Sequence, residues 1–244
     1  MRMLGDRNRP TPSHRYKQVF PPVVFPEEEQ VTESEEHLER RLRVRDSLKL
    51  ELQGRATVGT DQFVYWNATD MTLRVGPDVF VRLGVVVSPL SVFKTWLHGS
   101  PELAVEIVSP SDRPESKWDE KFARYQELGV QEVVRFDADA APAERLRIWD
   151  HVDGKLLERE TGERAEWSEV LGLWWVMVAE HGVGLTLRLA RDPVGQDLLL
   201  TPRERDARAR EAAEQARDDE RRAREAAEQR VRELEAELGR RGGC

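Results

Sequence analysis

Short apolar runs separated by turn-forming residues occupy the middle of the chain. Valine, isoleucine, leucine and aromatic residues gather in these runs, and Asn, Asp, Gly and Pro lie between them. This pattern is typical of β-strands with at least one buried face. The runs that we interpret as strands are 62–66, 71–75, 78–83, 103–108, 132–136, 145–149 and 155–160. A further β-rich stretch follows over residues 167–202.

Two other segments in the same region are predicted to be helices. The first, residues 34–52, follows Thr32 and has leucines at 38, 42 and 48 as its main apolar anchors. The second covers about residues 115–128 and ends at Gly129. A strand, a helix and another apolar strand in succession indicate a β-α-β crossover. We therefore expect an α/β (α+β) domain with a mixed β-sheet flanked by helices.

The C-terminal segment differs in kind from the middle of the chain. The sequence AREAAEQ occurs at 209–215 and again at 223–229, an offset of 14 residues or two heptads. The repeat and its composition predict a long charged helix. This repeat fits both a solvated single helix and a self-associating coiled coil, because the heptad positions that would face a partner helix are mostly alanine. We divide the chain into an extended N-terminal arm (1–30), a central domain (31–202) and a helical tail (203–244).

The charge distribution limits how this protein can bind nucleic acid. The formal net charge is −8, and residues 203–241 are neutral because 12 arginines balance 12 acids. The negative charge therefore belongs to residues 1–202. An acidic body argues against a broad electrostatic DNA-binding surface, so nucleic-acid contacts would be local or bridged by cations.

Cysteine content and hydropathy exclude several further classes of protein. The single cysteine, Cys244, excludes an intrachain disulfide and a thiolate zinc cluster. The N-terminus lacks the apolar core of a secretory signal. The longest apolar run, around residues 171–179, is too short to span a bilayer. We expect a cytoplasmic protein with no membrane partner.

A carboxylate lies inside the apolar run PELAVEIVSP. An unpaired Glu106 in a buried strand would cost several kcal/mol or would protonate. Asp78 opens the run DVFV, and the two carboxylates would face each other if their strands are neighbours. Facing carboxylates raise one pKa unless a cation lies between them, and oxygen ligands suit Mg²⁺ or Mn²⁺.

The helix after Glu106 brings a set of cations toward the same place. Lys117, Lys121 and Arg124 are spaced i, i+4 and i+7 on one face. A lysine at the border of this face can bury its stem and present its ammonium toward the strand ends. An adjacent face is aromatic and is expected to pack on the sheet: Trp118, Phe122 and Tyr125.

Each of these residues also has an ordinary structural explanation. Asp78 can be a turn aspartate, and Lys121 can be a solvated helix residue. Glu106 can be paired with an arginine such as Arg135. The evidence for a reactive site is therefore the combination of the three residues.

The chain resembles the Uma2 endonuclease family in three segments: GPDVFV, PELAVEIVSPSD and DEKFARYQELGVQEVVRFD. The resemblance spans about residues 34–230 and implies the restriction-endonuclease-like fold of the PD-(D/E)XK nucleases. It implies a metal-dependent endonuclease that hydrolyses phosphodiester bonds in DNA, with Asp78 and Glu106 as ligands of Mg²⁺ or Mn²⁺. Val108 stands where a (D/E)XK motif has lysine, and Lys121 matches the lysine that recurs in the family on the following helix.

The resemblance also bears on the first helix and leaves alternatives open. The sequence SEEH matches a frequent SPEH-like helix opening, which makes Glu36, beside His37, a further candidate acid. The rival hypothesis is an inactive nuclease-fold scaffold that self-associates through its C-terminal helix. A homodimer through the nuclease domain is the other arrangement that we consider. The remaining histidines, at 14, 98, 151 and 181, have no ligand spacing.

Overall fold

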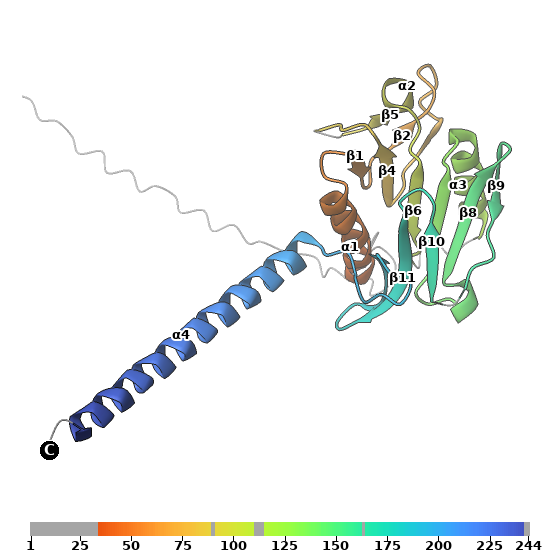
Figure 1. The fold of residues 1–244 in the computed structure, drawn as a ribbon. Coiled ribbons are helices and arrows are strands. Elements are labelled where there is room, and N and C mark those ends of the chain that lie inside the picture. The colour runs from red at the N-terminus through yellow and green to blue at the C-terminus, as the bar shows by residue number, and fades with distance from the viewer. Residues whose placement is uncertain (1–33, 89–90, 110–114, 163, 242–244) are drawn as a thin grey trace, which may run out of the picture. The chain divides into compact units, whose positions relative to one another are not determined.

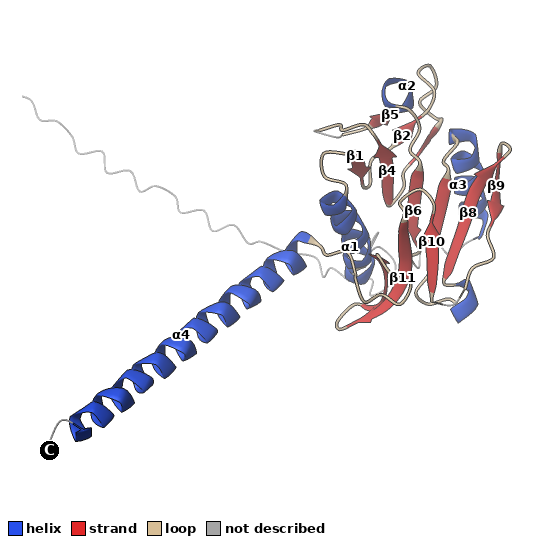
Figure 2. Cartoon of the chain, viewed as in Figure 1, coloured by secondary structure: helices blue, strands red, loops and turns tan. Residues whose placement is uncertain are grey.

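The computed structural model of the protein describes residues 34–88, 91–109, 115–162 and 164–241. The predicted N-terminal arm, residues 1–30, lies outside the described residues. The described chain is a mixed α+β structure with strands in three sheets and a long C-terminal helix (Figures 1 and 2). The predicted fold class is thus confirmed.

The main sheet has six strands in the order β1-β4-β6-β7-β8-β9. Strands β6 and β7 are parallel and joined by a helix, as the β-α-β pattern predicts. The other neighbouring pairs are antiparallel, so the sheet is mixed. The strands are β1 (Ala56–Gly59), β4 (Val79–Leu83), β6 (Leu103–Ile107), β7 (Glu132–Phe136), β8 (Leu146–Val152) and β9 (Lys155–Glu158).

Two smaller sheets accompany the main one. One is an antiparallel meander, and the other pairs three strands of two residues each. The meander consists of β10 (Ala165–Ser168), β11 (Leu173–Glu180) and β12 (Gly184–Ala190). The short sheet has the order β3 (Arg74–Val75), β2 (Val64–Tyr65) and β5 (Phe93–Lys94). A one-turn helix α2 (Thr95–His98) and a 3₁₀ turn η2 (Pro142–Glu144) complete the body.

The strands predicted over 62–66 and 71–75 are much shorter than expected. Between them, Asn67 accepts hydrogen bonds from the backbone N–H groups of Thr69 and Asp70, and Asp70 accepts one from Thr72. These local side-chain bonds offer the backbone an alternative to a sheet ladder. Only two residues of each predicted run therefore pair as strands, Val64–Tyr65 and Arg74–Val75.

Side chains of the main sheet alternate between two separate apolar cores. Val105 and Ile107 of β6 belong to the core that includes α1, β11 and β12, whereas Ala104 belongs to the core formed with α3. Position 106 therefore faces α3. The alternation directs the carboxylate of Glu106 toward the basic helix.

Helix α1 (Glu35–Glu51) begins at Ser34, whose hydroxyl accepts a hydrogen bond from the N–H of His37. The predicted leucine anchors are only partly correct, because Leu48 is fully buried but Leu38 is exposed. The buried face instead includes the polar residues His37 and Arg41. The covered face of α1 therefore combines these polar residues with Val44 and Leu48 of the apolar core.

Helix α3 (Glu115–Leu128) ends at Gly129, which has φ of 75° and terminates the helix as predicted. Its aromatic face packs on β8 of the main sheet. The ring centroids of Trp118 and Phe122 lie 5.1 and 5.5 Å from that of Trp149. This packing confirms the predicted orientation of the helix.

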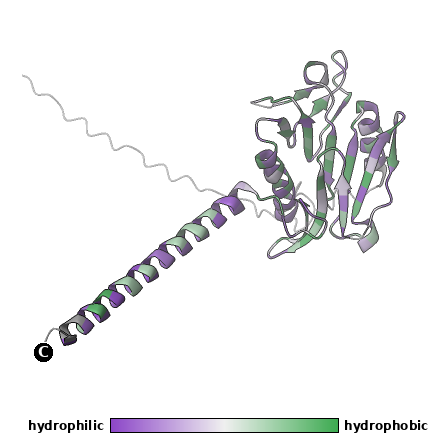
Figure 3. Cartoon of the chain, viewed as in Figure 1, coloured by the Kyte–Doolittle hydropathy of each residue, from purple (hydrophilic) through white to green (hydrophobic). Residues whose placement is uncertain are grey.

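Helix α4 (Pro202–Arg241) is 40 residues long and starts with a capping box. The N–H of Thr201 donates to the carboxylate of Glu204, and the N–H of Glu204 donates to the Thr201 hydroxyl. Figure 3 shows polar residues along this helix, interrupted by apolar positions. Among the described residues, no helix has the length and the hydropathy together that a membrane span needs.

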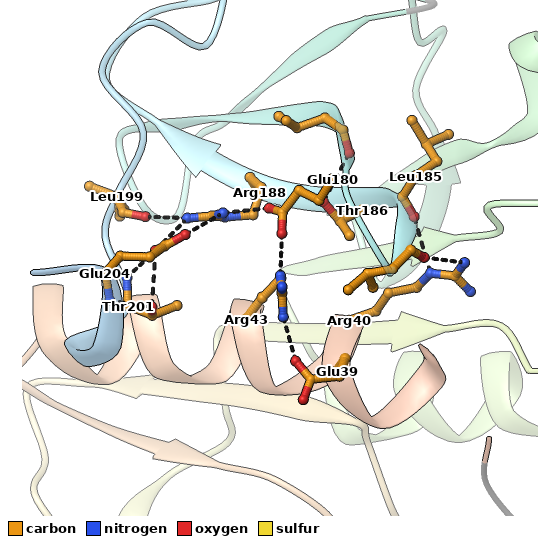
Figure 4. A network of polar contacts seen from close by, with 12 residues as sticks. Glu39, Arg40, Arg43, Glu180, Leu185, Thr186, Arg188, Leu199, Thr201 and Glu204 are labelled. Atoms are coloured by element: carbon orange, nitrogen blue, oxygen red, sulfur yellow. Dashed lines mark hydrogen bonds and ion pairs between the residues drawn. The ribbon is translucent and has the colours of Figure 1, made fainter. Parts of the chain in front are cut away.

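A buried arginine joins the start of α4 to the meander (Figure 4). Arg188 is 2% exposed, and its guanidinium donates to Glu180, to Glu204 and to the carbonyl of Leu199. Glu180 also accepts from Arg43 of α1. One guanidinium therefore holds β11, β12 and the α4 cap together.

We predict that Arg188→Leu lowers the free energy of unfolding by about 3 kcal/mol, because carboxylates and a carbonyl lose a buried donor together. Urea unfolding followed by circular dichroism measures this difference. Arg191→Leu is the matched control, since Arg191 is 48% exposed in its ion pair with Glu51 and such pairs contribute about 1 kcal/mol or less. Equal losses in the two variants would contradict the assigned role of Arg188.

Candidate active site

Asp78 and Glu106 come together through the pairing of β4 with β6. These strands are antiparallel neighbours, and Val79 is paired with Val105. Asp78 directly precedes β4, and its Oδ2 accepts a hydrogen bond of 2.7 Å from the N–H of Ile107. The pairing therefore puts positions 78 and 106 next to each other on neighbouring strands, as the sequence pattern predicts.

Two side chains of α3 hold the carboxylate of Glu106. The Nζ atom of Lys121 lies 2.6 Å from Oε2, and the hydroxyl of Tyr125 donates to Oε1. Lys121 and Tyr125 are spaced i, i+4, so both reach the strand from one side of the helix. Arg135 is the register partner of Glu106 on β7, and its guanidinium lies 4.9 Å from the ring centroid of Trp118.

Burial changes the acidity of this site. Glu106 is 6% exposed, and loss of hydration raises its pKa from 4.5 to about 7. The Lys121 ammonium opposes this rise, and the negative charge of Asp78 adds to it. Burial likewise raises the pKa of the Tyr125 hydroxyl, and the Glu106 charge raises it further. Tyr125 is therefore a hydrogen-bond donor at neutral pH.

The first helix contributes a residue other than the expected one. Glu36 is exposed, whereas His37 is buried and its Nε2 lies 2.6 Å from the carbonyl oxygen of Ile107 and 3.6 Å from Oδ2 of Asp78. A carbonyl oxygen only accepts, so Nε2 carries the proton and donates. The structure thus places Glu36 away from the two carboxylates and puts its neighbour His37 beside them.

Sequence reasoning missed the roles of His37 and Tyr125. In the sequence, Tyr125 belongs to an aromatic face that is expected to pack on the sheet. Its spacing of four residues from Lys121 is nevertheless a signal that both side chains point to the same strand. His37 carries no comparable signal, because its contacts lie 41 and 70 residues away at Asp78 and Ile107. Only the folded chain brings these residues together.

A small pocket opens beside Glu106. It has a volume of about 20 Å³ and is lined by Glu106, Ile107, Val108, Lys117, Trp118, Lys121 and Arg135. About 10–15 Å³ is enough for one water-sized group. The described residues contain no cluster of three or more His, Cys, Asp or Glu side chains suited to a metal. A cation here would rely on two carboxylates, and Mg²⁺ commonly keeps several waters in such sites.

The mixed sheet and the helix that crosses between two of its parallel strands are the architecture of a restriction-endonuclease-like protein. The chain belongs to the Uma2 family, described as "Putative restriction endonuclease", whose model matches residues 27–183. These residues include β4, β6 and α3, which carry the candidate site.

Solved structures that resemble this chain include a bacterial protein described as a nuclease. It is "a putative nuclease belonging to DUF820 from Anabaena variabilis ATCC 29413", whose crystal structure is known. The two chains are 11% identical, the match covers 57% of this chain and 75% of the other, and the TM-score is 0.42. No curated protein matches this chain.

We predict that single substitutions move the pKa of Glu106 in opposite directions. Asp78→Asn removes a neighbouring negative charge and lowers this pKa from about 7, whereas Lys121→Met removes a cation and raises it. Carbon-13 NMR of labelled glutamate side chains measures both shifts. A parent value near 4.5, or two shifts of the same sign, would contradict the assigned environment.

The same titration affects stability. Because the folded-state pKa lies above the ordinary value of 4.5, the folded protein binds this proton more tightly than the unfolded chain does. The contribution of Glu106 to stability is therefore most favourable below pH 4.5 and is lost as the pH rises through about 7.

Proposed function

We propose that this protein is a metal-dependent endonuclease that hydrolyses phosphodiester bonds in DNA. The observation that supports this most is the buried carboxylate of Glu106. It lies beside a second acid and an amine, and it lines a pocket that also includes basic side chains. Family membership favours the same chemistry.

The two carboxylates are the groups that would hold Mg²⁺ or Mn²⁺. Hard oxygen donors suit these ions, and a cation would offset the repulsion that helps to raise the pKa of Glu106. When bound, such an ion supplies Lewis-acid stabilisation of the developing phosphate charge and a more acidic water. Asp78 is held for this role by the N–H of Ile107.

The remaining groups orient the reactants. The Lys121 side chain is 33% exposed and lines the pocket next to Glu106, so its ammonium can bind a phosphate oxygen or the attacking water. Tyr125 donates to Glu106 from the buried side and holds this carboxylate in one orientation. His37 donates to the carbonyl of Ile107, the residue that follows Glu106 and whose N–H donates to Asp78.

We predict that the purified protein nicks supercoiled plasmid DNA in Mg²⁺ or Mn²⁺, and that Asp78→Ala and Glu106→Gln abolish nicking. Lys121→Met should reduce the rate, because it removes the amine beside the scissile phosphate. Agarose gels that separate supercoiled from open-circular plasmid measure the rate.

Glu127→Gln is the matched control for Glu106→Gln, because Glu127 is exposed on α3. It should nick like the parent. Calorimetric titration with Mg²⁺ separates loss of metal binding from loss of turnover. Plasmid nicking by both acid variants at the parent rate would refute the assignment of the site.

A scaffold role is the second candidate, and the exposure of α4 favours it. Nearly all of the described side chains of α4 beyond the first turn are exposed, and Val231 and Leu234 are among them. In this proposal, residues 31–202 form a nuclease-fold domain that lacks activity, and residues 203–244 form a tail that pairs with a second copy of the chain. Apolar side chains one turn apart are suited to helix pairing.

This proposal predicts a dimer that Val231→Glu with Leu234→Glu converts to a monomer of 28.1 kDa, because buried carboxylates would repel at the helix seam. Light scattering coupled to size-exclusion chromatography gives the mass. Gln215→Glu with Gln229→Glu adds two carboxylates on another side of α4 and should leave the dimer intact. A monomeric parent would rule out pairing through α4.

A further inference from the structure

A basic groove adjoins the candidate active site. It has a volume of about 240 Å³ and shares Lys117 and Lys121 with the pocket beside Glu106. Its lining residues come from β3, from α3 and from the segments that flank β2 and β3: Phe63, Arg74, Val75, Gly76, Lys117, Glu120, Lys121 and Arg124. The groove therefore leads to the site where the reaction is proposed to occur.

The charge of this groove is opposite to that of the whole chain. Four of its lining residues are cationic and one, Glu120, is acidic, whereas the chain carries a formal charge of −8. Glu120 is paired with Arg124, whose guanidinium also donates to the backbone carbonyl of Arg74. A local positive surface on an acidic protein is where a polyanion can approach.

An exposed aromatic ring lies among these cations. Phe63 is 43% exposed, although it directly precedes a buried strand residue. The Arg74 guanidinium lies 4.2 Å from the centroid of the Phe63 ring and donates to the Tyr65 hydroxyl. The ring is thus supported in one orientation by a residue of the same groove, while a large part of it stays open to solvent.

Cations beside an exposed ring form the arrangement by which proteins bind single-stranded nucleic acid. Positive side chains follow the phosphates, and an unpaired base stacks on the aromatic side chain. In a duplex the bases are stacked on each other, so an aromatic ring outside the helix contributes little. The ring and the cations of this groove therefore favour unpaired DNA over duplex DNA.

We infer that this groove binds a single-stranded DNA segment and stacks one of its bases on Phe63. The inference rests on the proposed nuclease function and specifies its substrate: DNA with an unpaired stretch next to the cleavage site. Arg74 and Arg124 hold the walls of the groove, and Lys117, which lines both the groove and the pocket, contacts the phosphate at the mouth of the pocket beside Glu106.

The test is binding of the full-length protein to fluorescein-labelled oligonucleotides in EDTA, followed by fluorescence anisotropy. The probes are a 12-nucleotide single strand and a blunt duplex of the same sequence. Phe63→Ala and Phe63→Leu should weaken single-strand binding by about 10-fold or more, and should change duplex binding by less than about 2-fold. Phe63→Trp should keep the affinity of the parent for the single strand.

Trp96→Ala is the matched control, since Trp96 is 45% exposed, similar to Phe63, but does not line the groove. It should bind both probes like the parent, and circular dichroism melting shows whether each variant is folded. Single-strand binding by folded Phe63→Leu at the affinity of the parent would overturn the inference. Equal losses for single strand and duplex would overturn it as well.

The binding test and the nicking test can fail independently. EDTA excludes metal-dependent cleavage, so the anisotropy reports the groove alone. If the protein binds single strands through Phe63 but never nicks DNA, the nuclease assignment fails and the groove assignment stands. If the protein nicks DNA but Phe63 variants bind like the parent, the groove assignment fails and the nuclease assignment stands.

Discussion

The pairing of Glu106 with Lys121 is the interaction on which the candidate site depends. A carboxylate taken out of water costs several kcal/mol unless a close partner offsets the loss of hydration. Here the partner comes from α3, and a second bond from Tyr125 of the same helix satisfies the other oxygen. The helix is thereby held against β6 in one register. A shift by one residue would leave the buried charge without either partner.

A second buried carboxylate, Glu132, joins two sheets instead of contributing to the candidate site. Glu132 is fully buried on β7, and burial raises its pKa. It accepts hydrogen bonds from Ser168 and Trp175 of the meander, so it joins the meander to the main sheet. Glu132 is paired with Leu103 at the start of β6, whereas Glu106 lies near the end of that strand. Burial with a raised pKa is common to both carboxylates. Their neighbours differ, since Glu106 lies beside Asp78 and Lys121, whereas Glu132 lies beside Asp150 and Arg159.

The cationic side chains of this acidic protein are grouped at particular places in the fold. The chain is acidic, yet cations gather in the groove next to Glu106. Other arginines form ion pairs within the domain: Arg188 with Glu204 at the start of α4, and Arg159 with Asp150. Net charge alone therefore says little about where a polyanion would bind. The position of each cation relative to the sheet decides it.

The sequence by itself determined the elements whose signals are local. The crossover from β6 through α3 to β7, the end of α3 at Gly129 and the long α4 all follow from patterns within a few residues. Asp78, Glu106 and Lys121 could likewise be singled out, because each departs from the pattern around it or matches a family motif. Only the tertiary structure decided which residues meet. It placed His37 rather than Glu36 beside Asp78, brought Tyr125 into contact with Glu106 and shortened the strands on either side of Asn67. Periodicity reports that a face is buried, but the partner of that face is set by strand pairing and helix packing between distant segments.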